Sequence, residues 1–229
     1  MELLHNGYTL DLSRGGFPLS TDSVVLAGFV RLSRNAKVLD LGSGCGTLGL
    51  LLCAEDPTCH VTGFELDEAA HGAALGNIRR NDLECRLESI CADLRTIPDT
   101  VAPGSFTACV SNPPYFSGGP ASAAHTAARR EDCCTLEDLL RSAAWALKYG
   151  GDFFLVHRPE RLAEIFTKSA AVQLEPKRLC LVRHRADGPV SLVLVQCRKG
   201  AKPGLLWEDL YLHESDGTPS MAYRKLYHL

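Results

Sequence analysis

The stretch KVLDLGSGCGTLG, which runs from Lys37 to Gly49, decides the fold of this 229-residue chain. Its first apolar residues surround an acid, Asp40, and a short run of this kind predicts a parallel strand buried on both faces. Glycines then follow at alternate positions, namely Gly42, Gly44 and Gly46. Glycine allows a tight turn and lets a ligand lie against bare backbone. A buried strand, a glycine turn and a leucine-rich helix start together predict a nucleotide-sized ligand site at the edge of an open α/β sheet.

The spacing of these glycines separates two kinds of cofactor site. A dinucleotide fold favours G-x-G-x-x-G, but Thr47 stands where the last glycine would be. The pattern is instead G-x-G-x-G with Asp40 two residues ahead, and it resembles the first motif of class I S-adenosylmethionine-dependent methyltransferases. The resemblance implies an α/β, Rossmann-like, seven-stranded sheet with helices on both faces and a C-terminal antiparallel hairpin. It also implies S-adenosyl-L-methionine as the cofactor and S-adenosyl-L-homocysteine as the product.

Composition places the chain among ordinary globular proteins. Apolar residues make up 45% and charged residues 22%, close to the usual values, and the length fits one domain. No apolar run reaches the roughly 18 residues of a membrane span, and the N-terminus lacks the features of a signal peptide, so we expect a cytoplasmic protein without membrane association.

The ten cysteines include no C-x-x-C motif, and we expect them to be reduced. The eight histidines show no metal-ligand spacing, and we expect no metal.

The charge is unevenly distributed along the chain. Residues 1–120 carry 8 Lys and Arg against 14 Asp and Glu, whereas residues 121–229 carry 16 against 13. This distribution permits an anionic partner on the C-terminal half, but does not by itself require one.

Two further acids follow the next predicted strands. Residues 59–64 predict a strand that ends in Glu65, where a carboxylate could accept hydrogen bonds from both hydroxyls of a ribose. Asp67 better suits the N-cap of the helix that follows. In the class, an Asp after the third strand (here residues 86–91) typically accepts from the adenine amino group, so Asp93 is the candidate, with turn formation as the alternative. The predicted cofactor contacts are Asp40, Gly42, Ser43, Gly44, Cys45, Gly46, Glu65, Leu66, Asp93, Leu94 and Asn112.

The sequence NPPYF, residues 112–116, directly follows a predicted strand over residues 106–111. In the class, a strand that ends in Asn-Pro-Pro-Tyr marks enzymes that methylate a planar, weakly nucleophilic nitrogen. The Asn112 side-chain oxygen and the Pro113 carbonyl could accept the two N–H bonds of that nitrogen and hold it in line with the methyl group. Proline has a fixed φ and no competing N–H, and Tyr115 offers a flat face to a flipped-out base. The predicted catalytic residues are Asn112, Pro113, Pro114 and Tyr115.

The stretch after this motif predicts contacts to the substrate. Residues 117–134 form the longest irregular segment, which is typical of a substrate loop. Arg129 and Arg130 within it are candidate phosphate contacts, with a solvated helix start as the alternative. The predicted substrate-binding residues are Tyr115, Phe116, Arg129 and Arg130.

The segment ahead of the first sheet strand also concerns the cofactor. Ser20, Thr21 or Asp22 predicts the N-cap of a helix through Leu32. In the class this segment commonly lies over the cofactor, so Asp22 or Ser23 could touch its methionine end; plain helix capping is the alternative.

We expect a single domain with additions at both ends. Residues 1–35 predict a hairpin and a helix that pack on the cofactor site, and residues 36–204 predict the class I methyltransferase domain. The runs 179–182 and 190–197 predict its final antiparallel hairpin. Residues 205–229 form a tail of the same domain, and its aromatic residues could cover a sheet edge.

Together the motifs resemble bacterial tRNA (adenine-N6)-methyltransferases that modify the adenine beside the anticodon of a valine tRNA. The matching stretches are residues 17–29, 37–49, 64–67, 111–116, 128–131 and 157–166. The resemblance implies methyl transfer to the exocyclic N6 amine of adenine in tRNA, with tRNA as the partner and no stable protein partner.

Other functions stay open at this point. Methylation of a protein glutamine side-chain amide uses the same motif, but those enzymes carry a helical substrate domain ahead of the cofactor strand, and only 36 residues precede Lys37. Another RNA base amine, for example in rRNA, is a second alternative. A DNA adenine methyltransferase would need a larger insert to read sequence. An inactive cofactor-binding RNA-binding protein is the alternative from a different class, and Thr47 disfavours a dinucleotide enzyme.

Overall fold

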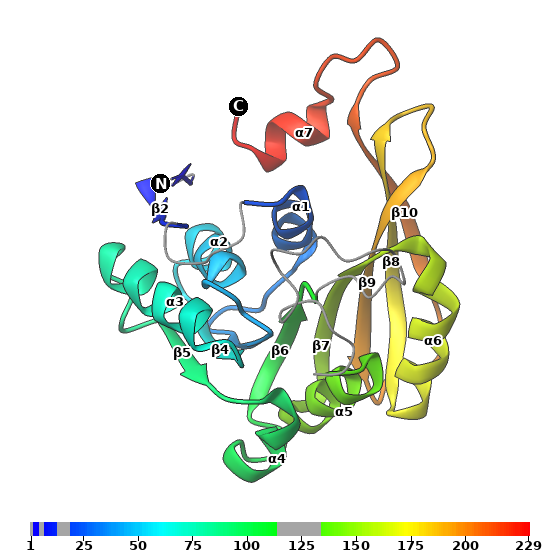
Figure 1. The fold of residues 1–229 in the computed structure, drawn as a ribbon. Helices are drawn as coiled ribbons and strands as arrows, with labels where there is room; N and C mark the ends of the chain where they lie inside the picture. The colour runs from blue at the N-terminus through cyan, green and yellow to red at the C-terminus, as the bar shows by residue number, and fades with distance from the viewer. Residues whose placement is uncertain (1, 5–6, 13–18, 114–133) are drawn as a thin grey trace, which may run out of the picture.

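The computed structural model describes residues 2–4, 7–12, 19–113 and 134–229. A central eight-stranded sheet has the strand order β10-β8-β9-β7-β6-β3-β4-β5, and two short strands, β1 and β2, pair separately (Figure 1). The strands are β1 Glu2–Leu3, β2 Thr9–Leu10, β3 Lys37–Leu41, β4 His60–Glu65, β5 Leu87–Cys91, β6 Phe106–Ser111, β7 Leu147–His157, β8 Leu174–Arg185, β9 Val190–Lys199 and β10 Leu206–His213. The α-helices are α1 Thr21–Phe29, α2 Thr47–Glu55, α3 Glu68–Arg80, α4 Ile97–Thr100, α5 Leu136–Ala146, α6 Leu162–Ala171 and α7 Met221–Leu226, with short 3-10 turns η2 Leu94–Thr96 and η3 Pro159–Arg161.

The directions of the strands define one functional edge. Strands β5, β4, β3, β6 and β7 are parallel neighbours. Strand β9 is antiparallel to both β7 and β8, and β10 is parallel to β8. Every strand of this sheet except β9 therefore points the same way. Ligands of open α/β sheets bind outside the carboxyl ends of the strands, so this edge is where the site is expected.

Helices cover both faces of the sheet (Figure 1). Each face has its own apolar cluster. Helices α1, α2 and α3 contribute to one cluster, and α5 and α6 contribute to the other. Along β3, Val38 belongs to the first cluster, whereas Leu39 and Leu41 belong to the second. The run of residues around Asp40 is thus buried on both faces, as its composition predicts.

The predicted seven strands of the sheet are all present, and the tail adds an eighth. Strand β10 pairs with β8 from Leu206 opposite Arg178 to His213 opposite Arg185. The expectation that the tail covers a sheet edge is confirmed. The tail then continues as α7, whose Leu226 lies directly over Gly28 of α1.

The described residues include nine of the ten cysteines, and all nine are free. Six of them are buried, as expected for small core residues. Within the described ranges no helix is long and apolar enough to cross a membrane, and no group of three or more His, Cys, Asp or Glu could hold a metal ion.

Candidate active site

The glycine turn lies at the carboxyl edge of the sheet, between β3 and α2. Gly42, Gly44 and Gly46 have φ values of 75°, 56° and 83°, a region that side chains with a Cβ rarely adopt. The N–H groups of Gly42 and Ser43 donate to the Phe64 carbonyl at 2.9 and 3.0 Å, which ties the turn to the end of β4. Gly46 begins α2 without a side-chain cap. The turn therefore presents bare backbone at the start of a helix, an arrangement suited to a polar ligand.

Glu65, at the end of β4, braces the glycine turn from the neighbouring strand. Its Oε2 accepts from the Gly44 N–H at 2.7 Å, and its Oε1 accepts from the Asp67 N–H at 2.8 Å. Asp67 caps α3 by accepting from the Ala70 N–H at 2.8 Å. The prediction that Asp67 is the N-cap of the following helix is confirmed. The carboxylate of Glu65 lies against the glycine turn, and its ribose contact stays a prediction from the sequence.

Asp40 is a buried acid at the end of β3. The residue is 2% exposed, and its Oδ2 has no hydrogen-bond partner among the described residues. Burial, and then the nearby charge of Glu65, raise the pKa of Asp40 to about 7. A buried carboxylate with an unsatisfied oxygen is costly unless a donor or a cation pairs with it. The site therefore favours a ligand that brings positive charge or N–H donors to Asp40.

Asn112 follows β6, which pairs with β3 on the side opposite β4. The Ser111 hydroxyl donates to the Leu41 carbonyl at 2.7 Å, so the ends of β6 and β3 are held together. Asn112 Nδ2 donates to the Ser23 Oγ of α1 at 2.9 Å. The structure thus gives Ser23 a contact with Asn112, a partner that the sequence analysis does not anticipate. Pro113 is buried beside Asn112.

Several predicted site residues lie outside the described residues. They are Pro114, Tyr115, Phe116, Arg129 and Arg130. Their roles stay predictions from the sequence.

Comparison with known proteins identifies the family. The model of the methyltransferase small domain matches residues 19–175, a range that includes the glycine turn, Glu65 and Asn112. The chain belongs to the methyltransferase small domain family.

Two curated relatives of this methyltransferase bear the same name. A tRNA1(Val) (adenine(37)-N6)-methyltransferase of Shewanella halifaxensis is 29% identical, over 96% of this chain and 94% of its own length. A protein of the same name from Bacteroides fragilis is 32% identical, over 77% of this chain and 75% of its own length.

Solved structures of methyltransferases share the fold. The crystal structure of a protein described as a predicted O-methyltransferase, from Agrobacterium tumefaciens, superposes with a TM-score of 0.76 at 22% identity, over 91% of this chain and 96% of that one. The geranyl diphosphate C-methyltransferase of Streptomyces coelicolor, solved with S-adenosyl-L-homocysteine, gives a TM-score of 0.58 at 14% identity, over 84% of this chain and 87% of that one. The fold prediction is therefore confirmed.

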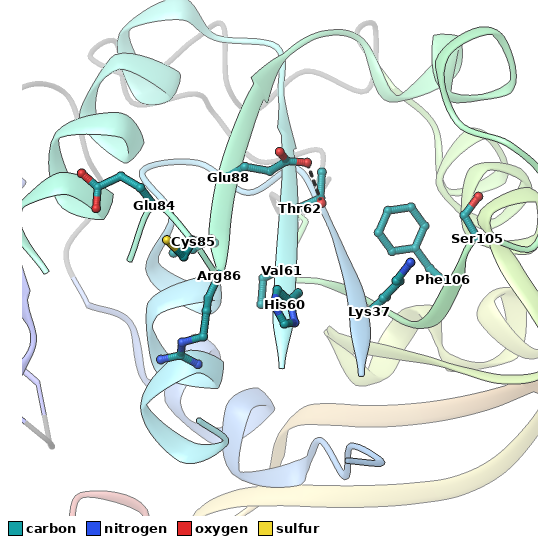
Figure 2. A pocket seen from close by; sticks show the side chains of 11 residues that line it. Lys37, His60, Val61, Thr62, Glu84, Cys85, Arg86, Glu88, Ser105 and Phe106 are labelled. Carbon is teal, nitrogen blue, oxygen red and sulfur yellow. Dashed lines mark hydrogen bonds between the residues drawn. The ribbon is translucent and has the colours of Figure 1, made fainter. Parts of the chain in front are cut away.

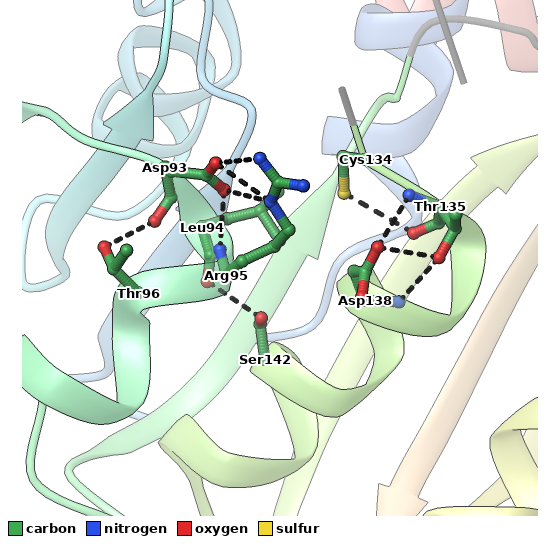
Figure 3. A network of polar contacts seen from close by, with 8 residues as sticks. All are labelled: Asp93, Leu94, Arg95, Thr96, Cys134, Thr135, Asp138 and Ser142. Atoms are coloured by element: carbon green, nitrogen blue, oxygen red, sulfur yellow. Dashed lines mark hydrogen bonds and ion pairs between the residues drawn. The ribbon is translucent and has the colours of Figure 1, made fainter. Parts of the chain in front are cut away.

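Asp93 of the methyltransferase is held by an arginine two residues away (Figure 3). The Arg95 Nε donates to both carboxylate oxygens of Asp93 at 2.9 and 3.0 Å, and the Arg95 N–H also donates to Oδ1 at 2.9 Å. The hydrogen bond from Arg95 lowers the pKa of Asp93. The Leu94 carbonyl next to it accepts from Ser142 Oγ on α5 at 2.9 Å. The acid is thus ionised and fixed in place, and the predicted adenine contact would have to share it with Arg95.

A hollow away from this edge lies at the opposite end of the sheet (Figure 2). It measures about 360 Å³ and is lined by residues at the starts of β3, β4 and β6, including Lys37, His60 and Phe106. Its walls carry both Glu84 and Arg86, so no single charge dominates it. None of the predicted site residues lines this hollow, and it lies at the wrong end of the strands for the cofactor.

Gly63, a glycine inside β4, supports the glycine turn and is not among the residues predicted from the sequence. A Cβ at this position would lie 2.6 Å from Ser43 Oγ and 2.7 Å from Ser43 Cβ. Ser43 belongs to the turn, and its Oγ is buried without a partner among the described residues. A glycine within a strand often marks the close approach of another backbone, and this signal could have found it.

Gly63→Ala is expected to weaken cofactor binding by about three- to tenfold, because the added methyl displaces Ser43 and with it the turn; the cost corresponds to roughly 1 kcal/mol of overpacking. Isothermal titration with S-adenosylmethionine measures the effect. The double variant G63A/S43G removes the opposing atoms and is expected to recover most of the affinity. Equal affinities for wild type and G63A would show that the turn tolerates the methyl.

Cofactor affinity is expected to rise about tenfold between pH 6 and pH 8, because the Asp40 carboxyl ionises through a pKa of about 7 and only its anion attracts a cationic ligand. Titration of wild type and of Asp40→Asn with S-adenosylmethionine between pH 6 and pH 8 measures how the affinity of each protein changes with pH. The variant is expected to bind weakly and to lack this component of the pH dependence. Parallel pH profiles for the two proteins would exclude Asp40 from cofactor binding.

The stability of the ligand-free protein is expected to change with pH in the opposite direction to the cofactor affinity, again because of Asp40. The pKa is raised from 3.8 to about 7, so the folded state holds the proton more tightly and stability falls as the pH rises between these values. Asp40→Asn should therefore stabilise the ligand-free protein more at pH 8 than at pH 5, as measured by thermal melting.

Proposed function

We propose that this chain transfers a methyl group from S-adenosylmethionine to the N6 amine of adenine in tRNA, at the anticodon-loop adenine of a valine tRNA. The observation that carries the proposal is the position of Asn112. This residue follows β6 at the carboxyl edge, next to the strand that carries the glycine turn, and its side chain is already hydrogen-bonded in place. Relatives that cover nearly the whole chain bear the name of this activity.

The described residues fit the cofactor. The glycine turn offers backbone with positive φ, Glu65 offers a carboxylate beside that turn, and Asp40 has a buried oxygen that lacks a partner among the described residues. The bound cofactor would supply an electrophilic methyl group on a sulfonium and leave as S-adenosylhomocysteine. Glu65 would bind the ribose, Asp40 would face the positively charged part of the molecule, and Asp93 would accept from the adenine.

Asn112 and Pro113 would position the substrate amine for attack on the methyl group. An adenine N6 amine is a poor nucleophile because its lone pair is delocalised into the ring. Acceptance of its two N–H bonds by the Asn112 side-chain oxygen and the Pro113 carbonyl would orient the amine and favour the pyramidal geometry of attack. Tyr115 would stack on the extruded base. The attack is a direct displacement and needs no covalent enzyme intermediate.

Nucleoside mass spectrometry tests the proposal. tRNA that lacks the modification is incubated with the protein and labelled S-adenosylmethionine, and N6-methyladenosine is expected in valine tRNA only. A transcript in which guanine replaces the anticodon-loop adenine should accept no label. Methylation of rRNA or of a protein glutamine instead would overturn the assignment of the substrate, and the absence of transfer to any of these would overturn the activity. The protein would work in the cytoplasm, where its tRNA substrate is found.

A further inference from the structure

The first turn of α1 places a serine hydroxyl against the Asn112 side chain. Asn112 Nδ2 donates to Ser23 Oγ at 2.9 Å, although the two residues are 89 positions apart in the sequence. Ser23 is 7% exposed, so water competes little for its hydroxyl. A side-chain amide can present either its oxygen or its NH₂ to a ligand, and the partner of the other half decides which.

A second serine hydroxyl lies next to this contact. Ser20 is the N-cap of α1, and its Oγ accepts from the Ser23 N–H at 3.2 Å. The two serine hydroxyl oxygens are also 3.2 Å apart. Ser20 Oγ has two lone pairs and can accept from both the N–H and the O–H of Ser23. With its proton directed to Ser20, the Ser23 oxygen is left as an acceptor, which matches the NH₂ of Asn112.

Helix α1, which carries the Ser23 hydroxyl, is packed tightly against the rest of the protein. Its residues Val25 and Leu26 are almost completely buried. The Phe29 ring meets the Phe154 ring of β7 edge-on, with centroids 6.2 Å apart. Arg178 of β8 donates to the Phe29 carbonyl at 3.3 Å and lies 4.2 Å from the Phe29 ring centroid. Ser23 is therefore fixed by the packing of the helix, as a positioning group must be.

We propose that Ser23 is a positioning residue for methyl transfer, which holds the NH₂ of Asn112 so that the carboxamide oxygen faces the substrate amine. The inference rests on the proposed function of Asn112. An Asn112 side chain turned the other way would set its own N–H groups against those of the amine, and the attack would lose an acceptor. Ser23 itself touches neither the substrate nor the reacting atoms. The expectation that Asp22 or Ser23 contacts the methionine end of the cofactor stays a prediction beside this role.

Kinetics of Ser23→Ala test the inference. The kcat on tRNA is expected to fall about 10- to 100-fold, the equivalent of one lost orienting hydrogen bond. The Kd for S-adenosylmethionine should stay within about twofold and the KM for tRNA within about threefold. Ser23→Thr keeps the hydroxyl and should recover most of the kcat. Thr21→Ala removes a neighbouring hydroxyl of the same turn, which makes no hydrogen bond among the described residues, and should change none of these values.

A second measurement does not depend on activity. The side-chain NH₂ of Asn112 is assigned by its loss from the ¹⁵N spectrum of N112A, and its exchange with solvent is measured. In S23A this exchange should be at least about tenfold faster than in wild type, because the protecting acceptor is gone. If S23A proves unstable, Ser23→Cys fills the same space with a weak acceptor and should give the same result.

The outcomes separate this inference from the proposed function. A wild-type protein that does not methylate tRNA would overturn the function, while the exchange measurement would still decide the contact between Ser23 and Asn112. Unchanged kcat in S23A would overturn the positioning role. A tenfold loss of cofactor affinity with unchanged kcat would assign Ser23 to cofactor binding and would also overturn it.

Discussion

Asn112→Ala is expected to lower the kcat for tRNA methylation by about 10²- to 10³-fold, the usual cost of removing one preorganised hydrogen-bonding group from a reaction centre. The Kd for S-adenosylmethionine should change by less than about threefold. The reason is that the proposed role of the Asn112 oxygen is to accept from the substrate amine, whereas most of the proposed cofactor contacts lie at the ends of β3 and β4. Single-turnover transfer of labelled methyl and isothermal titration separate the two quantities. Equal losses of turnover and cofactor affinity would refute the assigned role.

Asn81→Ala is the matched control for this variant. Asn81 is also a hydrogen-bonded asparagine: its Oδ1 accepts from the Thr9 N–H at 2.7 Å and its Nδ2 donates to the Thr9 carbonyl at 2.8 Å. It sits at the end of α3, where it fastens the N-terminal hairpin. Its removal should lower the melting temperature and leave kcat unchanged. The comparison distinguishes loss of an amide from loss of the amide at the reaction centre.

Glu65→Ala is expected to weaken S-adenosylmethionine binding by about 100-fold, because hydrogen bonds to a charged carboxylate are each worth roughly 1.5–3 kcal/mol. The change removes the predicted ribose contact and also releases the Gly44 N–H, which Glu65 Oε2 accepts at 2.7 Å. The missing negative charge should also lower the pKa of Asp40, since the charge of Glu65 contributes to raising it. Titration calorimetry at several pH values measures both effects.

Asp67→Ala provides the comparison for Glu65. Asp67 caps α3, so its loss should cost about 1 kcal/mol of stability and leave cofactor affinity within about twofold. A variant D67A that loses as much affinity as E65A would show that the two acids share the ribose.

The sequence determined the features that depend on neighbouring residues. The glycine turn is one of them, because Gly42, Gly44 and Gly46 each adopt a positive φ that side chains disfavour. The cap of α3 by Asp67 is another, since a cap needs only the first turn of its own helix. The order of the strands along the chain placed Glu65 and Asn112 at strand ends, and parallel pairing brings such ends to one edge.

Contacts between segments that are distant along the chain could not be predicted from the sequence. The approach of Ser43 to Gly63 depends on the spacing of β3 and β4, and the bond from Asn112 to Ser23 depends on where α1 packs. The pairing of β10 with β8 depends on which edge of the sheet stays open. A motif specifies which residue types are present, but it carries no information about how far apart these segments lie in the folded protein.

The class of ligand site and the residues that end its strands could be predicted from the sequence alone, because backbone conformation and apolar periodicity are local properties. The burial of Asp40, which raises its pKa to about 7, and the hydrogen bond from the Asn112 amide to Ser23 are visible in the folded chain alone. Burial and side-chain orientation arise from the assembled packing of the sheet and helices, and no single stretch of the chain contains them.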